Sequence, residues 1–130
     1  MRVLTLREPW ASLIAARIKT VETRSWKTNY RGELYIHTGL GKSEIPKEVE
    51  SDFEKLVSMP GHIIAKCKLT DCIYMDEEYL AEIKKGDIKN YVCGDYEIGR
   101  YAWILEDVEY IEPIKAIGKL GLWKYYPEEK

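Results

Sequence analysis

Lys19–Trp26, with the sequence KTVETRSW, combines two basic side chains, a carboxylate, three hydroxyls and an indole within eight residues. Residues 20–24 are rich in β-branched side chains and alternate in polarity, which predicts a short strand. Because successive side chains of a strand point to opposite faces, Glu22 and Arg24 share a face with Thr20. A face that carries two opposite charges borders water or a cavity, so we expect this strand to form the wall of a polar pocket.

Short strands and helices alternate along the rest of the chain. Strands are predicted at residues 2–6, 33–38, 62–74, 101–111, 114–117 and 122–125, and helices at residues 9–19, 43–58 and 76–84. Gly39 and Gly41 are expected to end a strand, and Gly86–Gly99 to form an irregular loop. About five to seven strands and two or three peripheral helices predict an α+β domain, and its glycine-marked corners are compatible with a closed or nearly closed β-barrel.

The composition is that of a soluble globular protein, with 45% hydrophobic and 32% charged residues. The length of 130 residues fits a single domain over residues 1–130. No apolar run approaches the roughly 20 residues that span a bilayer, and the N-terminus lacks the apolar region of a signal peptide. We therefore expect no membrane partner and a cytoplasmic location.

Cysteine and histidine are too few and too scattered to predict a metal site. The three cysteines, Cys67, Cys72 and Cys93, form no CxxC pair, and the chain has only two histidines. Cys67 and Cys72 lie in a predicted strand and are expected to pack as small apolar residues. We expect no metal and no cofactor.

Charge is unevenly distributed along the chain. The net charge of −2 is not that of a general nucleic-acid binder. However, residues 1–42 carry a net +5, residues 43–112 a net −9 and residues 113–130 a net +2. The basic charge lies in the same part of the chain as the polar stretch, which favours a local anion-binding surface, although scattered surface charges can also fall this way.

Five segments of the chain resemble the ASCH domain family of the PUA-like superfamily. They occur in the family's order and cover nearly the whole chain: Leu6–Ala11, Lys19–Trp26, Tyr30–His37, Gly99–Trp103 and Gly118–Trp123. The most diagnostic segment is the family's GxKxxExR signature. Lys19, Glu22 and Arg24 match it, and Arg17 occupies its glycine position.

The resemblance implies a small PUA-like β-barrel whose ligand cleft is lined by that signature, between the first helix and the barrel. It also implies a function close to that of domains that bind RNA or read modified bases. Some members of the family resemble small hydrolases of N4-acylated cytidine, in which a threonine lies three residues after the lysine, and the resemblance leaves RNA cleavage open as another activity. In this chain the threonine position is Glu22, flanked by Thr20 and Thr23.

The side chains of this stretch suit such a ligand on chemical grounds. Arg24 offers two parallel hydrogen bonds to a phosphate or a base edge, and Lys19 offers a mobile point charge. Glu22 can accept from the exocyclic amine of a base or act as a general base. Trp26 and Trp10 can stack on bases. With Arg7, these six residues are the predicted ligand-binding set, and Lys19 and Glu22 are the predicted catalytic pair if the protein is an enzyme.

Each of these residues also has a purely structural interpretation. Glu22 and Arg24 can form an ion pair with each other, and Arg7 can pair with Glu8 instead of reaching the cleft. Trp10 lies on the apolar face of its predicted helix, which favours the core. The remaining residues with a structural interpretation are expected in the core or in structural hydrogen bonds: Trp103, Trp123 and His37.

Three functions remain open on this evidence. The first is binding of single-stranded RNA or a small nucleotide-derived ligand. The second is an enzyme that acts on acylated cytidines or on RNA, with Thr20, Thr23 or a water as nucleophile. The third is a protein-interaction module in which the charged residues form a surface ion-pair cluster. The acidic middle of the chain disfavours duplex DNA, and we rank binding first and catalysis second.

Overall fold

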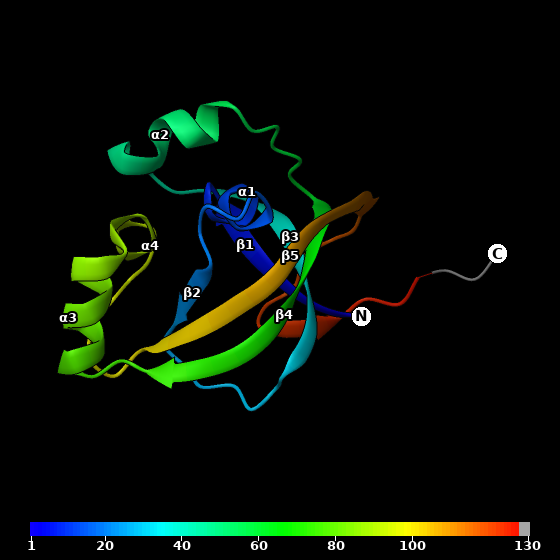
Figure 1. The fold of residues 1–130 in the computed structure, drawn as a ribbon. Coiled ribbons are helices and arrows are strands. Elements are labelled where there is room, and N and C mark those ends of the chain that lie inside the picture. The colour runs from blue at the N-terminus through cyan, green and yellow to red at the C-terminus, as the bar shows by residue number, and fades with distance from the viewer. Residues whose placement is uncertain (128–130) are drawn as a thin grey trace.

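The computed structural model describes residues 1–127, which form six strands and four helices (Figure 1). The strands are β1 (Arg2–Glu8), β2 (Val21–Arg24), β3 (Gly32–Lys42), β4 (His62–Tyr74), β5 (Tyr101–Lys115) and β6 (Leu122–Lys124). The helices are α1 (Trp10–Ala15), α2 (Lys47–Glu54), α3 (Glu77–Gly86) and α4 (Ile88–Val92). Within the described residues, no helix combines the length and apolar composition that crossing a membrane requires.

All six strands belong to one curved sheet in the order β2-β5-β4-β3-β1-β6. Every neighbouring pair is antiparallel except β1 and β3, which are parallel because the chain crosses back through α1 and β2 between them. The expected α+β class is confirmed, as is the number of strands. The sheet is not closed into a barrel, however, since the end strands β2 and β6 do not pair with each other within residues 1–127. Because β6 pairs with β1 only as far as Leu4, the rest of β1 lies open toward β2. We call this gap between β2 and β1 the seam.

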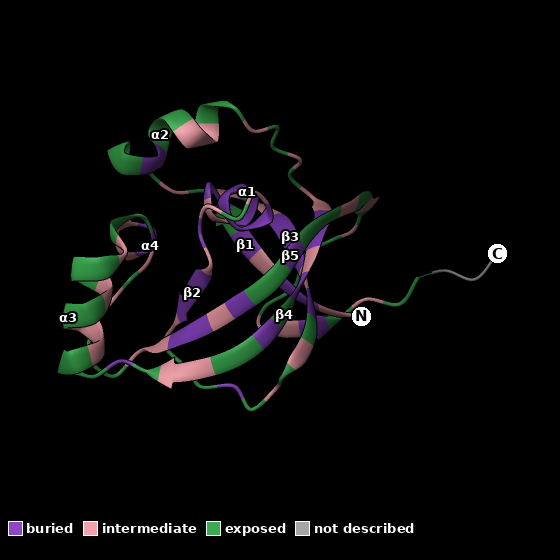
Figure 2. Cartoon of the chain, viewed as in Figure 1, coloured by how far each residue is buried: buried purple, intermediate pink, exposed green. Residues whose placement is uncertain are grey.

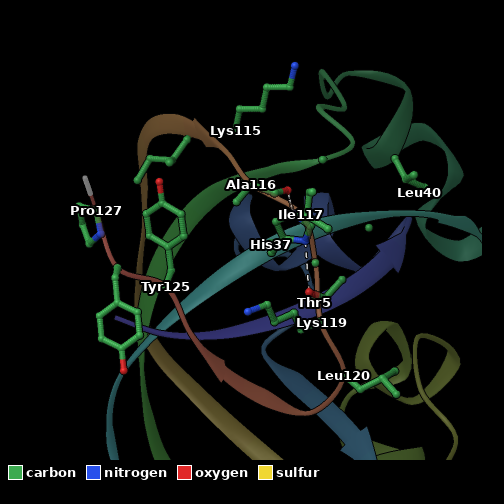
Figure 3. Close-up of a pocket in the computed structure, with 15 residues that line it drawn as sticks. Thr5, His37, Leu40, Lys115, Ala116, Ile117, Lys119, Leu120, Tyr125 and Pro127 are labelled. Atoms are coloured by element: carbon green, nitrogen blue, oxygen red, sulfur yellow. Dashed lines mark hydrogen bonds between the residues drawn. The ribbon is translucent and has the colours of Figure 1, made fainter. Parts of the chain in front are cut away.

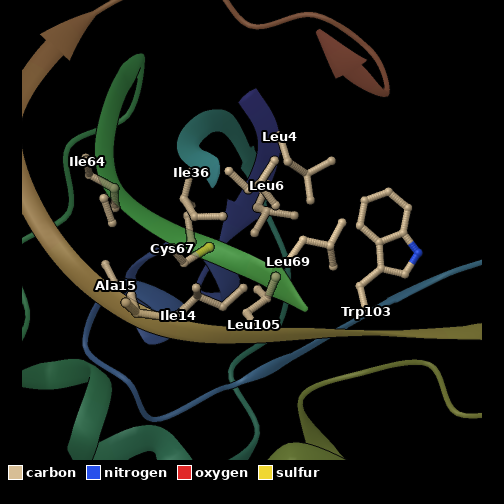
Figure 4. Packing of buried hydrophobic residues seen from close by; sticks show 14 residues of the cluster. Leu4, Leu6, Ile14, Ala15, Ile36, Ile64, Cys67, Leu69, Trp103 and Leu105 are labelled. Atoms are coloured by element: carbon tan, nitrogen blue, oxygen red, sulfur yellow. The ribbon is translucent and has the colours of Figure 1, made fainter. Parts of the chain in front are cut away.

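The main core lies between the concave side of the sheet and α1, whose residues Ala11–Ala15 are all buried (Figures 2 and 4). Trp103 of β5 is fully buried in it, as expected. Cys67 packs in the same core, and Cys72 lies partly buried against it. Trp123 of β6 is buried in a second cluster with Val3. Helix α1 therefore fills the concave side of the sheet. The position where this helix ends determines where β2 starts.

The predicted first helix is shorter than its apolar pattern suggests, because it ends in a left-handed turn. Arg17 has φ 64°, and the amide of Ile18 donates to the carbonyl of Leu13 while that of Arg17 donates to Ile14. This pattern is a Schellman cap, which usually has glycine at the left-handed position. The signature's glycine position is thus a helix cap. Here Arg17 occupies it, and its Nε donates to the carbonyl of Val108 at 2.6 Å.

Two further boundaries differ from expectation. Helix α2 begins at Lys47 rather than near residue 43, because a proline at position 46 disfavours helical backbone in the residue before it. Strand β3 continues through Gly39 and Gly41, which were expected to end it. A Cβ on Gly39 would lie 3.0 Å from the Thr5 side chain, and one on Gly41 would lie 3.0 Å from Arg7 Nε. These glycines allow side chains of β1 to cross the strand.

The second half of the chain contains one helix and one strand extension that the sequence did not indicate. Helix α4 lies inside the segment Gly86–Gly99, which was expected to be irregular, and brings the number of helices to four. Strand β5 runs on to Lys115, so the predicted separate strand at residues 114–117 does not form. Strand β4 has the predicted bounds. Helix α4 packs against α2 and α3 and faces the start of β2.

Candidate ligand-binding cleft

A cleft of about 310 Å³ opens at the seam where the sheet fails to close. We call it the signature cleft. Its walls come from β1, the start of α1, β2 and the residue before β5, and its lining consists of Thr5, Leu6, Arg7, Trp10, Glu22, Thr23, Arg24, Ser25, Trp26 and Arg100. Five of the six residues predicted to bind ligand therefore lie together in one cavity. The sixth, Lys19, does not line it.

Lys19 lies beneath the cleft with none of its surface exposed. Its Nζ donates to the backbone carbonyl of Val21 and, at 2.8 Å, to that of Cys93, and it lies 3.5 Å from Glu22 Oε1. Three acceptors thus surround a group that has three N–H donors when charged. Burial lowers the pKa of Lys19, and the negative charge of Glu22 opposes that shift. The lysine supports the carboxylate from below and does not touch the cavity.

Glu22 and Arg24 form the charged floor of the signature cleft. Arg24 Nε lies 3.2 Å from Glu22 Oε2, and the two side chains are 23% and 10% exposed. Both ion pairs of Glu22 are longer than the 2.7–2.9 Å usual for charge-assisted hydrogen bonds. The carboxylate therefore keeps capacity to accept from a ligand. Arg24 Nη2 also reaches across the seam to the carbonyl of Thr5 at 3.4 Å, which links β2 to β1.

Two indoles flank this floor. Trp26 is 38% exposed, and its ring meets Trp103 edge to face with 4.7 Å between ring centroids. The Trp103 Nε1 also donates to the carbonyl of Trp26 at 3.4 Å, so the exposed ring is held on a rigid base. Trp10 is partly buried against the core and lies 5.8 Å from Lys19 Nζ. It serves the core, as the helical pattern suggested, and also lines the cleft.

Two more arginines lie at the cleft. Arg7 is exposed, and its Nη2 donates to the carbonyl of Lys42 at 3.1 Å. Glu8 is not its partner, because that carboxylate accepts from Ser12 and Ser58. Arg100 was not predicted, since nothing in its local sequence separates it from other loop arginines. Its Nε donates to the backbone carbonyl of Asp95 at 2.8 Å. The lining thus holds three arginines and one carboxylate.

Helix α4 braces the start of β2 through a buried asparagine that sequence reasoning missed. Asn90 Oδ1 accepts from the amides of Thr20 and Val21 at 2.9 and 3.1 Å, and its Nδ2 donates to Thr20 Oγ1 at 3.0 Å. Thr20 therefore turns toward α4 and does not share the cleft with Glu22. The signal that could have indicated α4 is its N-cap residue Asp87, whose side chain accepts from the amide of Asn90.

The other candidate groups lie outside the signature cleft. His37 is buried, with Nδ1 3.2 Å from Thr5 Oγ1 and Nε2 2.7 Å from the carbonyl of Ala116. Trp123 Nε1 donates to the same Thr5 oxygen at 3.0 Å. Burial lowers the pKa of His37, and its bonds are structural, as expected. No group of three His, Cys, Asp or Glu side chains suited to a metal ion occurs within residues 1–127.

Comparison with protein families identifies the domain. The model of the ASCH domain matches residues 4–115, which include every residue of the signature cleft. The chain belongs to the ASCH domain family. Among curated proteins, it is similar to activating signal cointegrator 1 of Mus musculus and Homo sapiens, with 50% and 48% identity over 46 residues. That similarity covers 35% of this chain and 8% of each relative, so the chain spans only a small part of their length.

Solved structures of ASCH proteins have the same fold. The crystal structure of ASCH from Zymomonas mobilis covers 88% of this chain and 72% of its own, with a TM-score of 0.57 and 18% identity. A point mutant of the Zymomonas mobilis protein gives a TM-score of 0.55 at 19% identity, over 88% of this chain and 74% of its own. At this identity the likeness concerns the fold. It supports the PUA-like arrangement that the sequence resemblance implied.

Proposed function

We propose that this ASCH domain binds single-stranded RNA, or a modified nucleotide or nucleobase, in the signature cleft. The observation that carries the proposal is the pairing of Glu22 and Arg24 on the cleft floor, with the buried Lys19 fixed beneath them. A preorganised carboxylate and guanidinium side by side present an acceptor and a fork of donors to the polar edge of a base or to a phosphate.

The rim of the cleft supports the same ligand class. Trp26 offers a partly exposed ring held in place by Trp103, and a stacked base contributes about 1–3 kcal/mol by alanine substitution. Arg7 and Arg100 add positive charge around the cleft. A base between Trp26 and Glu22, with its phosphate near the arginines, would use every one of these groups. A cytosine or adenine would present an exocyclic amine to Glu22.

Catalysis is the second candidate, and it has a narrower basis. Of the predicted catalytic pair only Glu22 faces the cleft, because Lys19 is fully buried. Thr23 also lines the cleft, and its hydroxyl oxygen accepts from the amide of Asp95 at 2.9 Å. An amidohydrolase or ribonuclease built on these residues would use Glu22 as the general base and Thr23 or a water as the nucleophile. Binding requires no such step and therefore ranks first.

The test of binding is fluorescence anisotropy of a labelled single-stranded RNA hexamer at several salt concentrations. We expect the affinity to fall as salt rises, with a slope of roughly 0.7 per phosphate contact. Arg24→Ala should weaken binding at least about tenfold, since it removes a charge-assisted contact. Lys85→Ala is the matched control, because Lys85 is an exposed cation on α3 that lines neither the cleft nor any other described pocket.

Two outcomes would oppose the proposal. If the RNA does not bind, or binds equally strongly to Arg24→Ala and Lys85→Ala, the signature cleft is not the RNA-binding site. Turnover of N4-acetylcytidine or RNA that disappears in Glu22→Gln would instead favour the enzyme. Thermal melting of each variant shows whether a loss of binding reflects a loss of fold.

A further inference from the structure

Figure 3 shows a second and larger pocket, whose volume is about 1140 Å³ and which shares Thr5 with the signature cleft. We call it the C-terminal pocket, and it is bounded by residues 114–120, by Gly39 and Leu40 of β3 and by residues 125–127. Its floor is the pair Thr5 and His37, whose hydrogen bonds to each other and to Ala116 appear as dashed lines in Figure 3. The family signature contributes no residue to this pocket.

The two cavities meet at Thr5, which lines both of them. Strand β6 pairs with β1 only as far as Leu4, so the edge of β1 is open from Thr5 onward on that side. Arg24 reaches the carbonyl of Thr5 from the cleft side. On the other side Gly118 lies so close that an added Cβ would be 2.9 Å from Thr5 Oγ1 and from His37 Cε1. The two cavities are therefore neighbours on β1, and Thr5 is the residue that they share.

The lining of the C-terminal pocket is cationic and apolar. Lys115 and Lys119 are both exposed, and among the described residues that line the pocket none is acidic. In the chain as a whole, by contrast, 22 acidic residues outnumber 20 basic ones. Large apolar side chains stand exposed around the pocket: Leu40 at 83%, Ile117 at 89%, Leu120 at 98% and Tyr126 at 73%.

This combination selects among possible occupants. Separated cations with exposed aromatic and aliphatic surfaces, and no carboxylate among the described lining residues, match the alternating phosphates and base faces of a single strand. A neutral apolar partner would leave both lysines without a counter-charge. An acidic partner protein would not account for the neighbouring cleft, whose floor of Glu22 and Arg24 suits the polar edge of a base.

We propose that the ligand of this domain is an oligonucleotide whose strand runs from the signature cleft past Thr5 into the C-terminal pocket. This inference rests on the proposed function, because it extends the strand bound in the cleft. Lys115 and Lys119 contact the phosphates of the continuing strand, and Tyr126 stacks on one of its bases. The domain therefore recognises several consecutive nucleotides, and a single nucleotide occupies only the cleft.

The test is competition against a fluorescein-labelled cytidine octamer by unlabelled CMP and by oligocytidylates of two to eight nucleotides. We expect the affinity to rise at least about tenfold from CMP to the octamer. The double variant Lys115→Ala/Lys119→Ala should leave CMP affinity unchanged and weaken the octamer, with a salt slope smaller by roughly 1.4 for two lost phosphates. Tyr126→Ala should weaken the octamer about fivefold or more without affecting CMP.

Lys47→Ala/Lys85→Ala is the matched control, since both lysines are exposed and line neither cavity. If CMP binds through Arg24 but the octamer binds no tighter, or is unaffected by the loss of Lys115 and Lys119, the inference is overturned and the proposed function stands. If neither CMP nor the octamer binds, both are overturned. Octamer binding that survives Arg24→Ala would also overturn both, because the strand would then bypass the cleft.

Discussion

Replacing Lys19 by methionine tests whether the buried lysine holds Glu22 in place. Methionine fills most of the volume of the lysine side chain, but it removes the charge and with it the contact between Lys19 Nζ and the Trp10 ring. Lys19 is fully buried and Glu22 is 10% exposed, so the substitution leaves a nearly buried carboxylate with Arg24 as its remaining cation. Two carbonyls, of Val21 and Cys93, lose their donor as well.

The magnitude follows from these contacts. Removing one partner of a buried ion pair costs about 3–5 kcal/mol. Arg24 remains 3.2 Å from Glu22, so we take the lower end, about 3 kcal/mol, for the unpaired carboxylate. Because each carbonyl also loses a buried hydrogen bond, the total for Lys19→Met is expected to exceed about 3 kcal/mol. Against a domain stability of about 5–15 kcal/mol, this leaves a folded but weakened protein.

The assay is equilibrium urea unfolding of Lys19→Met, Glu22→Gln and the double variant. The double variant no longer leaves the Glu22 carboxylate or the Lys19 ammonium buried without the other, so its loss of stability should be smaller than the sum of the single losses by about 2 kcal/mol. Lys66→Met is the matched control, because Lys66 pairs with Glu109 at 3.2 Å on the exposed face of the sheet. It should change stability little. Additive losses of stability at Lys19 and Glu22, or a Lys19→Met loss no larger than the control's, would show that Lys19 does not hold the carboxylate in place.

Further predictions concern the supports of the cleft and the buried titratable groups. Asn90→Leu leaves the backbone amides of Thr20 and Val21 without an acceptor and should lower the free energy of unfolding in urea by about 2–4 kcal/mol. A loss below about 1 kcal/mol would show that Asn90 does not stabilise the start of β2. Arg17→Gly should be about 1 kcal/mol more stable than Arg17→Ala, since only glycine adopts φ 64° without strain, and equal stabilities would argue against the left-handed cap. Burial raises the pKa of Cys67 from 9.0 to about 12, so its contribution to stability is complete below pH 9 and is lost as the pH rises toward 12, at about 1.4 kcal/mol per pH unit. Under reducing conditions, the free energy of unfolding of Cys67→Ala should fall less steeply with rising pH than that of the wild type. The same slope in both proteins would show that Cys67 does not cause the alkaline loss of stability. Burial lowers the pKa of His37, so stability should fall as the pH drops below 6.5, and His37→Gln should reduce that fall; acid unfolding curves that coincide would speak against it.

Strand alternation placed Glu22 and Arg24 on the floor of the cleft but was wrong for Thr20, which turns toward Asn90 of α4. Glu22 and Arg24 share a cavity because residues two apart on β2 point the same way, and the bounds of β4 and the burial of Trp103 followed from equally local patterns. Trp10 shows how one residue can satisfy two interpretations, since it packs on the core and borders the cleft. Local sequence specified these features because the physical constraint is itself local.

The burial of Lys19 could not be predicted in this way. Its second carbonyl acceptor comes from Cys93, 74 residues further along the chain, directly after a helix whose five residues give little periodic signal. Arg100 enters the cleft through similar long-range packing. The left-handed turn at Arg17 was not predicted because arginine, unlike the glycine of the family signature, rarely adopts that conformation. The open seam depends on which end strands pair, which is a property of the whole sheet.

A crystal structure of the domain with a short single-stranded cytidine oligonucleotide would show directly whether the signature cleft binds it. We expect a phosphate oxygen about 3 Å from the guanidinium of Arg24 or Arg7, a base stacked on Trp26, and an exocyclic amine donating to Glu22. We also expect the strand to leave the cleft beside Thr5. An oligonucleotide bound elsewhere on the surface, with Glu22 and Arg24 still paired only to each other and to the protein, would contradict the central claim.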